Sequence, residues 1–245
     1  MKEASYSTVI PKILEEKGRS RISAQIKRTL QKYVRDRKEA VCLDVGCSSG
    51  KITYELSGLF KRTVGIDLDK EALKIARKRF KRKNLEFKLI NAENISFNDC
   101  TFEVVILNQV YEFVDNPKKL VAEVYRVLKP GGICFVGARN KLSLIEGQTG
   151  IPLIHFLSHE FVVKLLKYFG KSYYPPKYLN YRELKNLFKQ FKIFDLTPYI
   201  VKYPQMYGYK SLVKYSFITK LFPIWIFKML VFLFPNFIFI CRKKS

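Results

Sequence analysis

Five short apolar segments that alternate with helical ones constrain the fold of this 245-residue chain more than any other feature. They are AVCLDVG (40–46), TVGIDL (63–68), LEFKLIN (85–91), EVVILN (103–108) and ICFVGAR (133–139). Each is short, rich in strand-forming residues and almost continuously apolar, as is typical of strands buried on both faces. Helical periodicity occupies the intervals at 51–59, 70–82 and 117–127. The alternation predicts an α/β fold with a doubly wound, mostly parallel sheet.

The segments on either side of this series extend the predicted element order. Apolar residues at helical spacing over 20–35 predict a leading amphipathic helix. The L-K-P-G-G sequence at 128–132 predicts a turn between a helix and the next strand. After an aromatic-rich insertion at 140–179, residues 180–190 predict a further helix and residues 191–199 another strand.

The composition restricts the partners and the compartment. Lys and Arg total 45 against 21 Asp and Glu, a net charge of +24, which favours RNA, an acidic lipid surface or an anionic substrate. A lysine-rich solvated surface is the alternative interpretation. The five cysteines are scattered without a C-x-x-C pair, which indicates a reducing compartment and no zinc site. Because the N-terminal segment lacks the apolar core of a signal peptide, we expect a cytoplasmic protein.

The sequence VCLDVGCSSGKIT at 41–53 places a glycine loop directly after the first predicted strand. In an open parallel sheet, ligands bind beyond the carboxyl ends of the strands. The spacing of Gly46 and Gly50 fits neither the G-x-G-x-x-G dinucleotide fingerprint nor the G-x-x-x-x-G-K-[ST] phosphate loop. A shorter loop preceded by an acid suits a ligand that joins an amino acid to a nucleoside without phosphate.

Polar residues at the ends of the next two predicted strands suit the same ligand. Asp67 follows the second strand, where a carboxylate can accept hydrogen bonds from both hydroxyls of a ribose. The I-N-A-E-N sequence after the third strand supplies Asn91 and the backbone of Ala92, which can hydrogen-bond an adenine edge.

In that order, LDVGCSSG, VGIDLD, INAEN, FEVVILNQVYEFVDNP and RVLKPGG resemble the successive motifs of class I S-adenosylmethionine-dependent methyltransferases. The resemblance is strongest over residues 38–140 and continues weakly to FIFICRK near the end of the chain. It implies a Rossmann-like, seven-stranded sheet with an antiparallel last strand and a helical cap. It also implies one domain made of an N-terminal helical segment (1–37), a cofactor-binding core (38–140) and a C-terminal part (141–245) with the cap, the last two strands and an apolar segment.

The resemblance assigns a role in binding S-adenosyl-L-methionine to nine residues. These are Asp44 near the amino group, Gly46, Cys47 and Gly50 against the methionine portion, Asp67 at the ribose, Leu68, Asn91 and Ala92 at the adenine, and Asn108 beside the sulfonium. Three residues depart from the family pattern, namely Ser48 for a glycine, Asn91 for an aspartate and Glu103 for an aspartate. We expect the first two to weaken cofactor affinity and the third to be structural.

The candidates for a general base are His155, His159 and Tyr111, with Glu112 beside Tyr111. The two histidines are four residues apart and would share a helix face if that segment is helical. The alternative is that both are packed or surface side chains. A metal site is not expected, because H-x-x-x-H lacks the metalloprotease glutamate and no third ligand is evident.

The acceptor is predicted from the C-terminal half of the chain. An aromatic-rich cap and the apolar residues 221–241 favour a small, apolar or lipid-like acceptor, methylated on oxygen or carbon. An RNA methyltransferase and a non-catalytic S-adenosylmethionine-binding protein are the alternatives. For residues 211–234 we expect one apolar helix before the last strand. A peripheral contact with an anionic membrane and a transmembrane anchor are the other interpretations.

Overall fold

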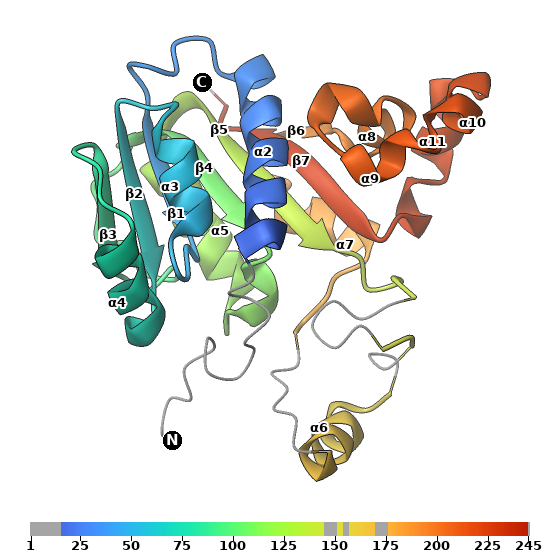
Figure 1. Ribbon diagram of the computed structural model, residues 1–245, viewed down its shortest axis with the longest axis horizontal. Helices are drawn as coiled ribbons and strands as arrows, with labels where there is room; N and C mark the ends of the chain where they lie inside the picture. The colour runs from blue at the N-terminus through green and yellow to red at the C-terminus, as the bar shows by residue number, and fades with distance from the viewer. Residues whose placement is uncertain (1–15, 145–150, 154–156, 170–175, 245) are drawn as a thin grey trace.

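The computed structural model describes residues 16–144, 151–153, 157–169 and 176–244. Their strands form one seven-stranded sheet in the order β3-β2-β1-β4-β5-β7-β6 (Figure 1). All neighbouring strands pair in parallel except β7, which lies antiparallel between β5 and β6. The strands are β1 (Val41–Val45), β2 (Arg62–Asp67), β3 (Leu85–Leu89), β4 (Phe102–Asn108), β5 (Leu128–Arg139), β6 (Lys192–Asp195) and β7 (Asn236–Arg242). This arrangement confirms the predicted doubly wound sheet with an antiparallel last strand.

Helices cover both faces of the sheet. On one face, α2 (Glu16–Tyr33), α3 (Lys51–Ser57), α4 (Lys70–Arg79) and α8 (Thr197–Lys202) pack against the strands. On the other face lie α5 (Pro117–Val127) and α7 (Tyr181–Leu187). Alternate residues of one strand supply the two cores: Leu43 and Val45 of β1 face α5, whereas Cys42 faces α2 and α3. α6 (His159–Tyr168) lies apart from the sheet in Figure 1.

Helix caps in the structure follow the residues that the sequence provides for them. The side chain of Asp69 accepts a hydrogen bond from the N–H of Ala72 and so caps α4. Asn180 and Glu183 form the reciprocal bonds of a capping box at α7. Each cap satisfies amide groups that the first turn of a helix leaves unpaired.

Three sequence predictions about the element boundaries are wrong. The L-K-P-G-G segment at 128–132 is part of β5, where the pairing with β4 shifts register instead of stopping. Residues 191–199 are divided between β6 and the start of α8, because Pro198 and Thr197 begin a helix there. Residues 211–234 are not one helix.

The C-terminal apolar segment is a series of short helices. They are α9 (Lys210–Val213), α10 (Ser216–Leu221), α11 (Ile224–Met229) and the 3-10 turn η5 (Val231–Leu233). Phe222 is extended before Pro223, as expected for a residue that precedes proline, and this ends α10. No helix in the described part of the chain combines the length and the apolar character needed to cross a bilayer.

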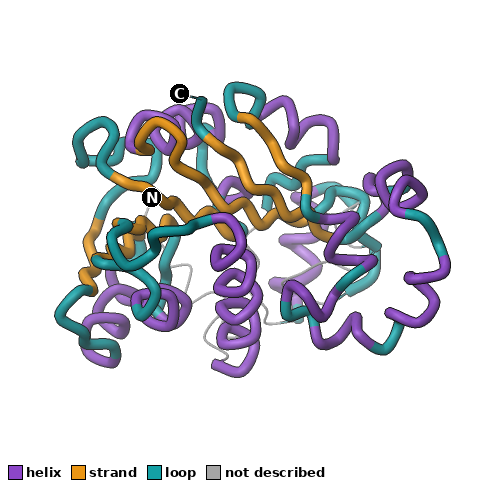
Figure 2. The backbone as a smooth tube through the Cα atoms, turned by 90° about the horizontal axis from the view of Figure 1, so that it is seen from above, coloured by secondary structure: helices purple, strands orange, loops and turns teal. Residues whose placement is uncertain are grey.

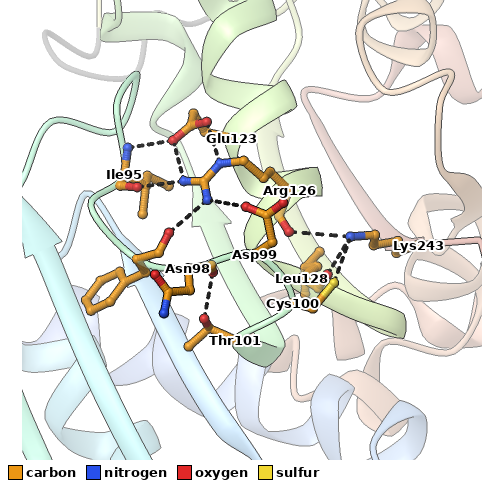
Figure 3. Close-up of polar contacts among 10 residues, drawn as sticks. Ile95, Asn98, Asp99, Cys100, Thr101, Glu123, Arg126, Leu128 and Lys243 are labelled. Atoms are coloured by element: carbon orange, nitrogen blue, oxygen red, sulfur yellow. Dashed lines mark hydrogen bonds and ion pairs between the residues drawn. The ribbon is translucent and has the colours of Figure 1, made fainter.

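Arg126 of α5 ties the connection between β3 and β4 to the rest of the domain (Figure 3). Its guanidinium donates to both carboxylate oxygens of Glu123 and to Asp99, and to the carbonyl oxygens of Ile95 and Phe97. Glu123 in turn accepts the N–H of Ile95 at 2.7 Å. The network fixes residues 95–99 and thereby supports the start of the same connection, where Asn91 lies.

Candidate cofactor site

The loop between β1 and α3 is tightly folded and packed against two neighbours. Gly46, Ser48 and Gly50 all adopt left-handed conformations, with φ of 70°, 48° and 78°. A Cβ on Gly46 would lie 2.6 Å from Cγ2 of Val110, and one on Gly50 would lie 2.6 Å from the ring of Phe87. Only glycine fits at those two positions. Ser48 shows that the third left-handed position accepts a side chain.

Hydrogen bonds attach this loop to the end of β2. The N–H groups of Gly46 and Cys47 both donate to the carbonyl of Ile66, at 2.8 and 3.0 Å. The N–H of Ser48 donates to Oδ2 of Asp67 at 2.7 Å. The side chain of Cys47 is buried in the core beneath α4, and burial raises the pKa of its thiol. Cys47 therefore shapes the loop from below, and its thiol does not point into the site.

Asp67 and Leu68 place a carboxylate and an exposed apolar side chain at consecutive positions at the end of β2. The carboxylate of Asp67 also accepts the N–H of Asp69 at 2.9 Å, and burial raises its pKa. Because each carboxylate oxygen offers two lone pairs, Asp67 can still accept two hydroxyl groups. The next side chain, Leu68, is 60% exposed. A carboxylate next to an uncovered apolar side chain fits a ribose joined to a flat base.

Asp44 places a second carboxyl beneath the loop. It is buried, and its Oδ2 accepts a hydrogen bond of 2.6 Å from the hydroxyl of Thr53. Burial raises the pKa of Asp44 to about 7, against the opposing effect of the Thr53 hydrogen bond. A cationic group that reached this carboxyl would favour its ionised form.

Arg19 is a residue of this site that sequence reasoning missed. Its guanidinium donates to Oγ of Ser48 at 3.3 Å and lies near enough to Asp44 to lower that carboxyl's pKa. α2 is held in place there because Ser20 donates to Glu55 of α3 at 2.7 Å, and Ser23 donates to the same carboxylate. No local motif in the sequence signals this contact, since it depends on how α2 packs beside the loop.

The remaining predicted cofactor residues lie at the ends of the neighbouring strands. Asn91 and Ala92 follow β3, and Oδ1 of Asn91 accepts the N–H of Glu93 at 2.8 Å. Asn108 ends β4 opposite Gly137 of β5. Since β3, β2, β1 and β4 are consecutive in the sheet, their carboxyl ends bring all nine predicted residues to one edge.

Glu103, the third departure from the family pattern, has structural contacts. Its carboxylate accepts the N–H of Val41 at 2.7 Å and pairs with Lys129. Glu103 thus joins β1 to β4 at the amino ends of these strands, opposite the cofactor site.

Of the candidate bases Tyr111, His155 and His159, only Tyr111 has its side chain among those that the structure describes. Tyr111 is a core residue, because it is 1% exposed and its hydroxyl bonds to the carbonyl of Arg139 and the N–H of Leu179. Burial also raises its pKa, which disfavours the ionised form that a base would use, and its role as a base stays a prediction. His155 and the side chain of His159 lie outside the described residues. Residues 157–158 are not helical, and α6 begins at His159 after the cap Ser158, so the condition for a shared helix face is not met in the described residues.

Glu112 differs from Tyr111 because part of it is unpaired. It is buried, and Oε1 accepts the N–H of Arg139 at 3.2 Å. Oε2 has no hydrogen-bond partner among the residues that the structure describes. Burial raises the pKa of Glu112 to about 7.

Comparisons with known proteins agree with the fold and with the position of the candidate cofactor site. Residues 43–136 match the family model of a methyltransferase domain. A structure of a putative S-adenosylmethionine-dependent methyltransferase from Listeria monocytogenes shares the fold, with a TM-score of 0.58 at 16% identity over 92% of this chain and 100% of that one. Residues 43–136 are thus similar to a methyltransferase domain, and the chain shares the fold of that structure.

Sequence relatives match part of the chain. An uncharacterised protein of Methanocaldococcus jannaschii is 28% identical over 60% of this chain and 69% of its own length. A ubiquinone biosynthesis O-methyltransferase of Thiobacillus denitrificans is 32% identical over 51% of this chain and 52% of its own length. A ubiquinone/menaquinone biosynthesis C-methyltransferase of Desulfotalea psychrophila is 35% identical over 38% of each chain. The matched part of the chain thus spans about half of the length of the O-methyltransferase and less than half of the length of the C-methyltransferase.

Proposed function

We propose that the protein transfers the methyl group of S-adenosyl-L-methionine to an oxygen or carbon atom of a small, lipid-like acceptor. The observation that carries the cofactor assignment is the pair formed by Asp67, half-buried and ionisable, and Leu68, exposed and apolar, beside the β1–α3 loop. The acceptor class is supported by the relatives, whose names place them in quinone biosynthesis with both O- and C-methylation.

The residues of the site divide the recognition of the cofactor between them. Asp67 would accept the ribose hydroxyls, while Leu68, Asn91 and Ala92 would contact the adenine. Asp44 would lie near the amino group of the methionine portion, and Arg19 would supply positive charge for its carboxylate. When bound, the cofactor would supply a methyl group on a sulfonium sulfur, so that in-line attack by the acceptor atom breaks the carbon–sulfur bond and the thioether takes the electron pair.

The proposal assigns catalysis to positioning and to exclusion of water. An in-line displacement depends mainly on alignment of the acceptor with the methyl group. Asn108 lies at the end of β4 where the sulfonium end is expected. No general base is assigned, since Tyr111 is a core residue and the side chains of His155 and His159 lie outside the described ones.

Calorimetry with S-adenosylmethionine tests the cofactor assignment. We expect Asp67→Ala to weaken binding by at least about tenfold, because two hydroxyl contacts with a charged acceptor are lost. Asp36→Ala, an exposed acid before β1, is the matched control and should bind as the unchanged protein does. Absence of binding by the unchanged protein would refute the proposal.

A tritiated-methyl assay then tests the acceptor class. Label should appear in the organic phase when a lipid extract is supplied. Label in RNA would favour the RNA alternative, and binding without transfer to any fraction would favour a non-catalytic protein.

A further inference from the structure

The short C-terminal helices carry an apolar surface that the described part of the chain leaves open to solvent. Outside residues 142–169 and 206–233, only Leu68 and Leu89 are exposed large hydrophobic residues among those described. We define the C-terminal apolar surface by ten exposed side chains: Val213, Tyr215, Phe217, Ile218, Leu221, Phe222, Trp225, Met229, Phe232 and Leu233. A set of this size within 21 consecutive residues, 213–233, indicates a surface that contacts something else.

These helices contribute little to the core. α9 and α10 bury no residue, and α11 buries only Phe227. They are nevertheless held in place, because the ammonium of Lys202 in α8 donates to the carbonyl of Phe222 at 2.7 Å. In both Figure 1 and Figure 2 they lie at one end of the molecule, beyond β6 at the edge of the sheet. Their apolar side chains are therefore presented by an ordered scaffold.

The charged side chains of the segment that carries this surface have one sign. The chain contains no Asp or Glu after Asp195. Four exposed lysines accompany the apolar side chains, namely Lys210, Lys214, Lys220 and Lys228. Apolar side chains among lysines are what a protein needs at the interface of an anionic bilayer, where the apolar groups enter the acyl boundary and the ammonium groups meet phosphates.

The C-terminal apolar surface extends toward the carboxyl ends of the parallel strands, where the cofactor site lies. The side-chain amide of Asn140, directly after β5, donates to the carbonyls of Phe232 and Phe234 at 2.7 and 2.9 Å. β5 runs parallel to β4, so its end lies at the same edge as the ends of β1 and β2. The exposed side chains of Phe232 and Leu233 therefore continue the apolar surface toward that edge.

We propose that the C-terminal apolar surface docks the protein on the surface of an anionic lipid bilayer. A second copy of the chain is a poorer occupant, because a symmetric contact would bring the lysines of both copies together and residues 196–245 supply no acid to pair with them. RNA is also a poorer occupant, because phosphates would leave the apolar side chains uncovered. The proposal does not depend on methyl transfer and is tested without cofactor.

The single tryptophan of the chain provides a direct readout. Trp225 in α11 is 59% exposed and lies within the proposed surface. On addition of phosphatidylcholine vesicles that contain phosphatidylglycerol, its emission should shift to the blue and be quenched by brominated lipids. Vesicles of phosphatidylcholine alone should give a weaker response, since the lysines then have no anionic partners.

Paired variants distinguish vesicle binding by this surface from nonspecific adsorption of the protein. Phe217 and Leu221 are 77% and 70% exposed, so Phe217→Ser with Leu221→Ser removes apolar surface without creating a cavity. We expect this variant to lose at least about tenfold in vesicle affinity, because burial of apolar area drives such binding. Leu89→Ser, at an exposed apolar position on β3, is the control and should bind normally.

A second pair tests the charge. Lys214→Glu with Lys220→Glu should abolish the preference for anionic vesicles. The same change of net charge at Lys81 and Lys83, which are exposed after α4, should leave binding largely intact. Equal losses in both variants would overturn the proposal.

Two further outcomes would also overturn it. One is bound protein whose Trp225 emission does not change. The other is absence of vesicle binding together with a dimer in sedimentation that Phe217→Ser with Leu221→Ser converts to monomer, which would assign the surface to a second copy of the chain. Cooperative thermal unfolding by circular dichroism shows that each variant is folded, so failure of the cofactor to bind the unchanged protein would leave the vesicle result standing.

Discussion

At the scale of single residues, Asp44 makes the proposed cofactor affinity depend on pH. The pKa of this carboxyl is raised to about 7 by burial, so below that pH it is largely protonated in the free protein. Contact with the cofactor's ammonium group requires the carboxylate, so the proton must leave first. We expect affinity to fall by up to about tenfold for each pH unit below about 7, as calorimetry can measure.

Asp44→Asn is the matched variant for this prediction. An amide oxygen can still accept the hydroxyl of Thr53, but the group no longer titrates. The variant should bind more weakly than the unchanged protein at about pH 8, with an affinity that changes little down to about pH 5.5. Equal affinity of the unchanged protein at those two pH values would contradict the assignment.

Glu112 affects stability rather than binding. Its pKa is about 7 in the folded protein and about 4.5 when exposed, so the folded state holds the proton more tightly. This contribution is fully present below about pH 4.5 and is lost as the pH rises to about 7, for a total of roughly 3 kcal/mol. Relative to the unchanged protein, Glu112→Gln should therefore gain about 2–3 kcal/mol in free energy of unfolding between about pH 5 and pH 8.

Urea unfolding at the two pH values measures this difference. Glu71→Gln, at an exposed glutamate of α4, is the control and should follow the unchanged protein at both. If Glu112→Gln gives parallel curves instead, Glu112 is not the group responsible.

At the scale of elements, Arg126 holds the β3–β4 connection against α5 through hydrogen bonds (Figure 3). Glu123 and Asp99 raise the pKa of Arg126, and the guanidinium also binds two backbone carbonyls. Arg126→Ala should lower the free energy of unfolding by about 2–4 kcal/mol, because several charge-assisted hydrogen bonds are lost together. It should also weaken cofactor binding, since Asn91 begins the same connection.

The comparison variant is Arg62→Ala. Arg62 pairs with Glu86 at 2.8 Å, but both side chains are more than 40% exposed, so the loss should be under about 1 kcal/mol. Similar thermal unfolding of the two variants would show that the Arg126 network adds no more than a surface ion pair.

The elements also show which part of the fold could be predicted from sequence. The first five strands and α5 were predicted because residues buried on both faces, or on one helix face, leave a periodic pattern. The series from α9 to η5 was not, because apolar composition is the same whether a helix is buried or exposed. Arg19 was missed for a similar reason, since its contact with Ser48 joins segments 29 residues apart and depends on helix packing.

For the molecule as a whole, the stability of the sheet depends on its last strand, β7. β7 fills the space between β5 and β6, and five consecutive residues, 237–241, are buried there. Four of them are Phe or Ile, each of which contributes about 1.5–3 kcal/mol on burial. That sum is comparable to the whole stability of a typical domain, which is about 5–15 kcal/mol.

A chain that ends at Pro235 should therefore not fold cooperatively. Without β7, β6 has no partner strand and the apolar edge of β5 is open to solvent. Thermal unfolding followed by circular dichroism should show no cooperative transition, and calorimetry should show no S-adenosylmethionine binding. Removal of Lys244 and Ser245 alone is the control and should change neither, because Lys244 is exposed. A cooperative transition in the chain ending at Pro235 would mean that the parallel strands β1 to β5 and their helices form an independent unit.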